Sequence, residues 1–259
     1  MKMKRVLGFI LLLAVVISVS PLRAQSFEFG LNGRNRHGTV RIGVKGIEVD
    51  YGRRDHYVGH PMVWGMGFNI LPSPDYALYD ETDRGFFELD VARSQRWFIT
   101  PFHAAVAINR EATFGLVSGL GIVWNNYVFD RNITVARVDG LLMPIPLDKN
   151  YKKSKLTTVS LSVPLELEAQ FPSRHASDRR FFVAGGLLGE VVLGAHTKYK
   201  KPKHKQKGNL DMGPFQGALT LRAGYNDVSL FCHYYLTSLF ENDKGPEMQG
   251  VTFGVGLNL

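Results

Sequence analysis

The stretch that decides the fold is KLTTVSLSVPLELEAQF, which runs from Lys155 to Phe171. From Val159 onward, apolar side chains occupy every second position, and the positions between them are Ser, Pro, Glu or Gln. Successive side chains of a β-strand point to opposite faces, whereas a helix repeats its face about every 3.6 residues. The stretch therefore predicts a long β-strand with one apolar face and one polar face.

The same alternation recurs along the chain, and no useful length of helical periodicity separates its occurrences. One segment, Thr39–Tyr51, changes phase near Gly46, as a β-bulge would make it do. The chain is therefore predicted to be all-β. The eight predicted strands are Thr39–Tyr51, Trp97–Asn109, Phe114–Trp124, Lys155–Phe171, Phe181–His196, Phe215–Tyr225, Val228–Leu236 and Val251–Leu259.

The connections between the predicted strands alternate between short turns and longer, mostly polar loops. The turns cover residues 110–113, 172–179 and 226–227, and the loops cover residues 52–93, 130–154, 198–212 and 241–248. Short periplasmic turns, longer surface loops and an even number of strands are typical of an outer-membrane barrel. We predict a closed, antiparallel, up-and-down transmembrane β-barrel of eight strands with periplasmic termini. Ten strands is the alternative, with Pro61–Leu71 and Phe86–Val91 as the additional two.

A soluble β-sandwich would also give each strand one apolar and one polar face. The predicted strands are nevertheless long enough to span lipid, which takes about 9–11 residues, whereas strands of soluble sheets have about 5–6. The polar faces carry charges and many glycines, which suit a narrow lumen, and aromatic residues gather near strand ends as interfacial girdles do. These aromatic residues are Trp97, Trp124, Tyr127, Phe129, Phe181, Tyr225, Tyr234, Tyr235 and Phe240.

The N-terminus has the pattern of a secretory signal peptide. Three positive charges in Met1–Arg5 precede the uncharged apolar run Val6–Val19, which is too short for a spanning helix, and a cleavage site follows. We predict cleavage after Ala24, a periplasmic segment at residues 25–36 and a barrel domain at residues 37–259; a signal anchor is the alternative. Removing residues 1–24 lowers the formal charge from +8 to +4, because it removes four basic residues and no acid.

The cysteine and histidine content argues against disulfide bonds and metal sites. The single cysteine, Cys232, excludes a disulfide framework. Neither the pair His56 and His60 nor the pair His196 and His204 is spaced on a single predicted strand or helix that would fix the geometry of metal ligands. We therefore expect neither a metal nor a cofactor.

Several quoted segments carry a resemblance to a known family. They are LVSGLGIVWNNYVFDRNITV, KSKLTTVSLSVPLELE, GLLGEVVLGAHTKYK, LRAGYNDVSLFCHYYLTSLF and VTFGVGLNL, with HGTVRIGVKG as a less exact match to the first strand. In order and spacing these segments resemble the outer-membrane β-barrel family of the Bacteroidetes that is often called PorT-like. The resemblance covers residues 37–259 and implies a small barrel, usually of eight strands, in the outer membrane, without a set of catalytic residues. The chain departs from the usual pattern in its last residue, Leu259, and in the apolar material at Pro61–Leu71.

The polar faces of the strands predict a network of charges inside the barrel. An eight-stranded barrel has a lumen just wide enough to be filled by side chains, so charges there must pair. We interpret the network as a structural plug of salt bridges, with an ion path or proton relay as the alternative. The residues predicted to share this interior are Arg41, Lys45, Glu166, Glu168, Glu190 and Arg222.

The predicted function is that of an integral outer-membrane barrel with a structural, binding or secretion-associated role. One alternative is an outer-membrane lipid-modifying enzyme of the acylhydrolase kind, and another is a narrow channel for small solutes. The one close His/Ser pair, His175 and Ser177, falls in a turn predicted to be periplasmic, away from outer-leaflet lipid. We therefore expect no enzymatic activity.

The basic stretch KYKKPKHKQKG, residues 198–208, would by itself suggest binding to a polyanion. Pro202 and the closely spaced charges predict a loop tip between two strands, over the outer leaflet. Lipopolysaccharide phosphate is then the predicted contact, nucleic acid is not expected as a partner, and a solvated loop without a ligand is the alternative. The lysines of this predicted contact are Lys198, Lys200, Lys201, Lys203, Lys205 and Lys207.

Overall fold

The computed structural model describes residues 27–33, 36–43, 46–50, 57, 59–109, 111–148, 154–172, 180–199, 204–207 and 210–258. The predicted signal peptide, residues 1–24, lies outside these residues. None of the helices in the described ranges has the length and apolarity of a membrane-spanning helix.

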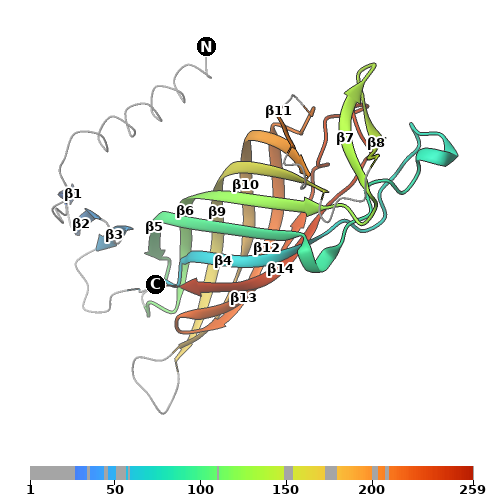
Figure 1. Ribbon diagram of the computed structural model, residues 1–259. Helices are drawn as coiled ribbons and strands as arrows, with labels where there is room; N and C mark the ends of the chain where they lie inside the picture. Colours follow the sequence, from blue (N-terminus) through green and yellow to red (C-terminus); the bar gives the residue numbers. More distant parts are fainter. Residues whose placement is uncertain are drawn as a thin grey trace.

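Eight antiparallel strands close into a β-barrel, as predicted (Figure 1). Each strand pairs with the next barrel strand along the chain, and the last pairs with the first, so that the barrel is closed. The strands are β4 (Met62–Ile70), β5 (Gln95–Ala107), β6 (Phe114–Val128), β9 (Ser154–Pro172), β10 (Arg180–Tyr199), β12 (Phe215–Tyr225), β13 (Val228–Tyr235) and β14 (Val251–Asn258).

The alternation of side chains places polar residues in the lumen and apolar residues on the outer surface. On β12, Gln216, Thr220 and Arg222 are buried, while Leu219 and Leu221 between them are exposed. The outward side chains form a continuous surface that we call the apolar belt. Its members are Ile99, Phe102, Ile122, Trp124, Val163, Leu165, Leu167, Phe171, Phe181, Leu187, Val191, Leu193, Phe215, Leu219, Leu221, Tyr225, Val228, Leu230, Tyr234, Phe253, Val255 and Leu257.

The first barrel strand is β4, so the prediction that Thr39–Tyr51 opens the barrel near His37 is wrong. In β4 the apolar residues alternate with Gly65, Gly67 and Asn69, which is the same two-residue period as in the other strands. Near Gly46 the segment is not a bulged strand but divides into two antiparallel strands, Arg36–Gly43 and Gly46–Asp50, with Gly43 opposite Gly46. Since Met62–Ile70 replaces the early segment, the total of eight strands is unchanged and the ten-strand alternative does not apply.

Three short strands at the start of the described chain form a small antiparallel sheet beside the barrel. It contains β1 (Phe27–Gly33), β2 (Arg36–Gly43) and β3 (Gly46–Asp50). β3 attaches to β5 by a short parallel pairing of Ile47 and Glu48 with Ala104 and Ala105. β5 continues beyond the start of β4, and this pairing covers part of the edge that β4 leaves free.

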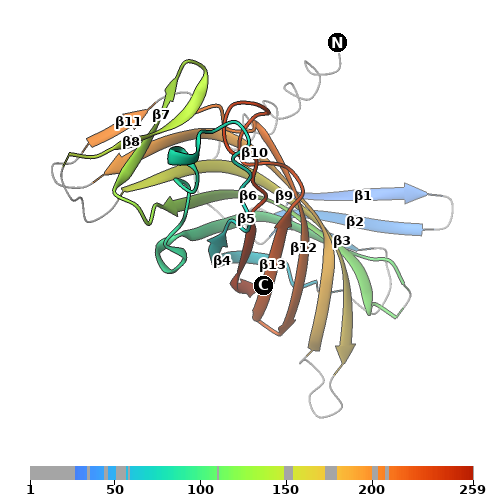
Figure 2. The same ribbon diagram turned by 90° about the vertical axis from the view of Figure 1, so that its right-hand side faces the viewer.

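The long connections fold together over one end of the barrel instead of forming separate polar loops (Figure 2). We call residues 71–94, 129–148, 210–214 and 236–250 the cap; it includes the hairpin of β7 (Ile133–Val138) and β8 (Leu141–Pro146) and the short 3-10 turns Glu81–Asp83 and Val91–Arg93. Backbone bridges join its segments at Asp75 with Glu247, Leu89 with Phe129 and Met212 with Phe240. Its apolar core contains Tyr79, Phe86, Phe87, Phe129, Ile133, Val135, Leu142, Leu210, Met212, Leu239, Phe240 and Met248.

One further expectation changes at this end, which we call the cap end. Phe86–Val91, a strand only in the ten-strand alternative, belongs to the first loop, where Phe86 and Phe87 are buried in the cap core and Val91 begins a 3-10 turn. The basic stretch is not only a loop tip: β11 (His204–Lys207) pairs with the end of β10, with Lys198 opposite Lys205. We call the opposite end, where β4 begins and β14 ends, the strap end, after the segment that directly precedes β4.

Candidate functional site

The charged side chains of the lumen form a first cluster near the strap end. Glu166 and Glu168 are two residues apart on β9 and therefore both face inward, toward Arg222 on β12. Arg222 Nη2 lies 2.7 Å from Glu166 Oε2 and 3.6 Å from Glu168 Oε2. Thr220 donates a hydrogen bond to Glu166 Oε1 at 2.9 Å. One guanidinium thus serves two buried carboxylates.

The chain just before β4 turns into the barrel and completes this cluster. We call this segment, Tyr57 and residues 59–61, the strap. Glu168 accepts hydrogen bonds from the Tyr57 hydroxyl at 3.2 Å and from the main-chain N–H of His60 at 3.1 Å, and its Oε1 lies 2.9 Å from His60 Nδ1. Arg222 Nη1 donates to the main-chain carbonyl of His60 at 2.8 Å.

Aromatic packing and two glycines fit the strap to the barrel wall. The ring of His60 stacks on Phe182 with a centroid distance of 4.4 Å and an interplanar angle of 9°. Gly115 has no side chain, and a Cβ there would overlap the ring of Tyr57. Gly59 lies against Ala105 in the same way. Burial raises the pKa of the Tyr57 phenol well above its ordinary value, and the Glu168 carboxylate raises it further.

A second cluster lies nearer the cap end. Arg96 on β5 pairs with Glu190 on β10, and both side chains are fully buried. Arg96 Nη1 donates to the Tyr235 hydroxyl at 2.6 Å and to Asn125 Oδ1 at 3.3 Å. Tyr235 in turn donates to Glu190 Oε1 at 3.1 Å. The guanidinium, the carboxylate and the phenol therefore form a closed triangle of hydrogen bonds across the lumen.

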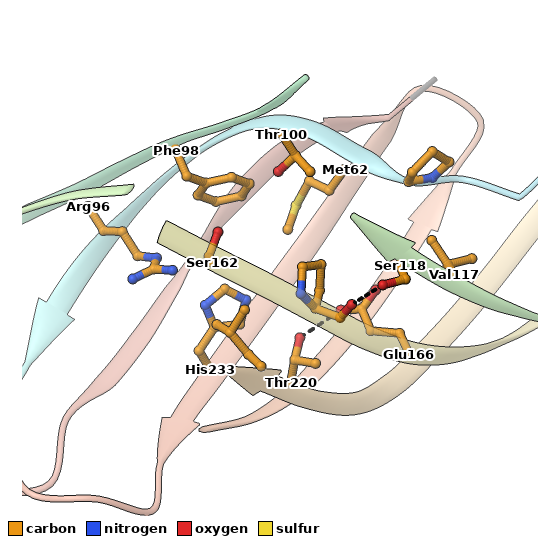
Figure 3. A pocket seen from close by; sticks show the side chains of 13 residues that line it. Met62, Arg96, Phe98, Thr100, Val117, Ser118, Ser162, Glu166, Thr220 and His233 are labelled. Atoms are coloured by element: carbon orange, nitrogen blue, oxygen red, sulfur yellow. Dashed lines mark hydrogen bonds between the residues drawn. The ribbon is translucent and has the colours of Figure 1, made fainter. Parts of the chain in front are cut away.

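A small cavity separates the two clusters (Figure 3). It has a volume of about 30 Å³, enough for one or two water molecules, and Arg96 lies on one side of it with Glu166 on the other. Phe98 and Met62 also line it, and Phe98 packs against Phe231. The wall includes His233, whose buried Nδ1 has no hydrogen-bond partner among the described residues. Side chains therefore fill most of the lumen.

The predicted interior network is divided by the structure into several parts. Glu166, Glu168 and Arg222 come together at the strap end, whereas Glu190 is paired with Arg96 in the other cluster. Arg41 lies on β2, which is not one of the eight barrel strands, and its side chain is not described, so its place in the lumen stays a prediction. Lys45 lies outside the described residues.

Several partners in these clusters were missed by reasoning from the sequence, among them Tyr235, which was predicted at the membrane interface and is instead buried in the lumen. Strand alternation could have located Arg96, because Trp97 and Ile99 lie on the outward apolar face and Arg96 therefore lies on the opposite, inward face. Tyr57 and His60 carry no such signal, since they belong to no strand and reach Glu168 only because the strap turns into the barrel.

Other predicted sites lie outside the described residues or have side chains that are not described. His56, His175, Ser177, Lys200, Lys201 and Lys203 are in the first group, and Lys205 and Lys207 are in the second. Lys198 is half-buried near the end of β10. In the part of the chain that the structure describes, no group of three or more His, Cys, Asp or Glu residues could hold a metal ion.

An open depression of about 360 Å³ lies on the cap. Its lining consists of Leu78, several small or polar residues and four acidic residues, Asp75, Glu241, Asp243 and Glu247. This acidic depression lies on the cap, away from the ion clusters of the lumen.

In comparisons with known proteins, no family model and no curated protein sequence matches this chain. The class of the protein therefore rests on its fold. The chain forms a closed, eight-stranded antiparallel β-barrel, an architecture consistent with an outer-membrane protein.

Proposed function

We propose that the chain is an integral outer-membrane β-barrel whose lumen is filled by its own side chains. The apolar belt is the observation that carries this proposal. Leu230 is 66% exposed, Leu221 60% and Phe215 59%, although all three lie in regular strands. Soluble monomers rarely expose contiguous apolar patches larger than a few hundred Å². Lipid is the environment in which such a surface is stable.

Aromatic residues at the two ends of the belt support the same proposal. Phe171 and Phe181 lie next to each other on β9 and β10, with ring centroids 6.0 Å apart, and Tyr225 continues the row on β12. Trp97 and Trp124 are paired toward the opposite end, and Trp64 contacts Trp97. Barrels in outer membranes carry aromatic girdles at both interfaces. With the strap end in the periplasm, the cap faces the outside of the cell.

The filled lumen favours a structural or binding role over transport. Both ion clusters cross the lumen, and the cavity between them has room for only one or two water molecules. A hydrated solute would have to displace Arg96 or Arg222 from a buried carboxylate. We therefore propose that no solute passes and that planar-bilayer recordings of the purified protein show no conductance.

The proposed role is one of binding or assembly in the envelope, without a reaction. The lumen carboxylates Glu166, Glu168 and Glu190 are engaged in ion pairs and hydrogen bonds. The likeness to the PorT-like family supports a secretion-associated role, and the lysines of the basic stretch, residues 198–208, support contact with lipopolysaccharide phosphate. An unchanged lipid A profile in an overexpressing strain is expected, and deacylated lipid A would overturn the non-enzymatic role.

Fractionation of cells and gel migration test the proposal. The protein should sediment with outer membranes, stay there after a carbonate wash, and migrate faster on a gel when it is not boiled. Recovery as a soluble monomer in the periplasmic fraction would refute the membrane assignment.

A further inference from the structure

At the strap end, side chains of the barrel bind both main-chain polar groups of His60, as a receptor binds the main chain of a peptide. Glu168 accepts the main-chain N–H of His60 at 3.1 Å, and Arg222 donates to the main-chain carbonyl of the same residue at 2.8 Å. Main-chain hydrogen bonds provide affinity for any extended segment, whereas side-chain pockets provide specificity. Both charged groups are fully buried, so the main chain of residue 60 meets a fixed donor and a fixed acceptor.

Next to these two main-chain hydrogen bonds, the barrel wall has two surfaces that each contact a ring of the strap. Phe182 offers a flat face on which the His60 ring stacks at 4.4 Å, and the bare surface of Gly115 receives the Tyr57 ring. The hydroxyl of that tyrosine reaches Glu168 at 3.2 Å. The receptor side comes from β6, β9, β10 and β12, which are held in the barrel by their own ladders. These strands do not need the strap in order to pair.

We propose that the strap end of the lumen is a peptide-binding site that the strap occupies as a tethered ligand. The ligand class is an extended peptide with an aromatic residue three positions before a residue with a flat ring, as in Tyr57-x-x-His60. Glu168 and Arg222 bind the main chain, while Phe182 and Gly115 select the rings. This inference goes beyond the envelope role proposed above and does not depend on where the barrel resides.

A tethered segment competes with a free peptide at an effective concentration of about 1 mM. Weakening the strap should therefore expose the site. The test uses the full-length protein in detergent micelles and a labelled peptide with the sequence of residues 55–63, DHYVGHPMV, followed by fluorescence anisotropy. The strap variant Tyr57→Ala/His60→Ala should bind this peptide about tenfold or more tightly than the unaltered protein does.

Two carboxylate substitutions locate the binding. Adding Glu168→Gln to the strap variant should weaken peptide binding about tenfold or more, since the amide has no charge and replaces one accepting oxygen with a donor. Adding Glu190→Gln is the matched control, because it alters an equally buried carboxylate in the other cluster, and it should leave the affinity unchanged. Equal affinity for the strap variant and the unaltered protein would overturn the proposal. So would absence of binding to the folded strap variant, or binding that survives Glu168→Gln.

A second measurement decides the question if the strap variant does not fold. Hydrogen exchange at the His60 amide of the unaltered protein should accelerate about twofold or more when the same peptide is added at about 10 mM, because the peptide displaces the strap. A peptide with alanine at its tyrosine and second histidine should have no effect. An unchanged exchange rate with DHYVGHPMV would overturn the proposal.

Discussion

Replacement of Arg222 by leucine should destabilise the barrel strongly, because this guanidinium serves two buried carboxylates. The Arg222 side chain is fully buried, Glu168 is fully buried, and the Glu166 side chain is 5% exposed. Removing one partner of a buried ion pair costs about 3–5 kcal/mol, since the remaining charge is left without compensation. With an m-value of about 2–3 kcal/mol/M, the urea midpoint should fall by about 1–2.5 M.

Urea unfolding in lipid vesicles, followed by the loss of the fast-migrating gel band, measures this change. Arg93→Leu is the matched control, since Arg93 is 61% exposed in a surface pair with Asp90, and its loss should cost about 0–1 kcal/mol. Combining Arg222→Leu with Glu166→Gln and Glu168→Gln should recover most of the stability, because no buried charge is then left uncompensated. A cost below about 1 kcal/mol for Arg222→Leu, or no recovery in the triple variant, would refute this reasoning.

Three further predictions concern the cap, the belt and the strap. Phe87 is fully buried in the cap core, so Phe87→Ala should lower the stability of the cap by about 3–5 kcal/mol and open it to protease, while the barrel keeps its fast-migrating band. Leu78→Ala, at an exposed position, should have neither effect. Protease resistance of the cap in Phe87→Ala would contradict the packing. Leu221→Lys should cost about 2–4 kcal/mol of unfolding free energy in vesicles, whereas Leu78→Lys in the cap should be neutral; equal costs would argue against lipid at Leu221. Burial raises the Tyr57 pKa, so the hydrogen bond from Tyr57 to Glu168 should be present below pH ~10 and be lost as the pH rises through the pKa of the folded protein. The absorbance titrations of the unaltered protein and of Tyr57→Phe should therefore differ only well above pH ~10. A difference centred near pH ~10 would contradict the burial of Tyr57.

The strands were predictable because each has its own period of two, which requires no knowledge of its partners. β4 was the exception, since Thr39–Tyr51 has a competing alternation and Gly65 and Gly67 make Met62–Ile70 less polar on its inner face. A choice between two such segments depends on which one can pair with both β14 and β5, and pairing is a property of the closed barrel.

The candidate site was predictable only where strand parity decides it. Parity alone puts Glu166, Glu168 and Arg222 on inner faces, but the pairing of Glu190 with Arg96 depends on register and on the shear of the barrel. The contacts of His60 were beyond reach because a segment without regular structure turns into the lumen. The cap was also missed, because its aromatic residues are distributed over connections that meet only once the barrel has closed.

The lone cysteine provides the most direct test of the central claim that the apolar belt faces lipid. Cys232 is exposed on β13, where it lies next to Leu221 of β12 and Phe253 of β14. A nitroxide label on Cys232 of the protein in vesicles can be probed with oxygen, which concentrates in lipid, and with a water-soluble nickel complex. If the belt faces lipid, the label should collide frequently with oxygen and rarely with the nickel complex. Collisions dominated by the nickel complex would show that this face lies in water and would contradict the account.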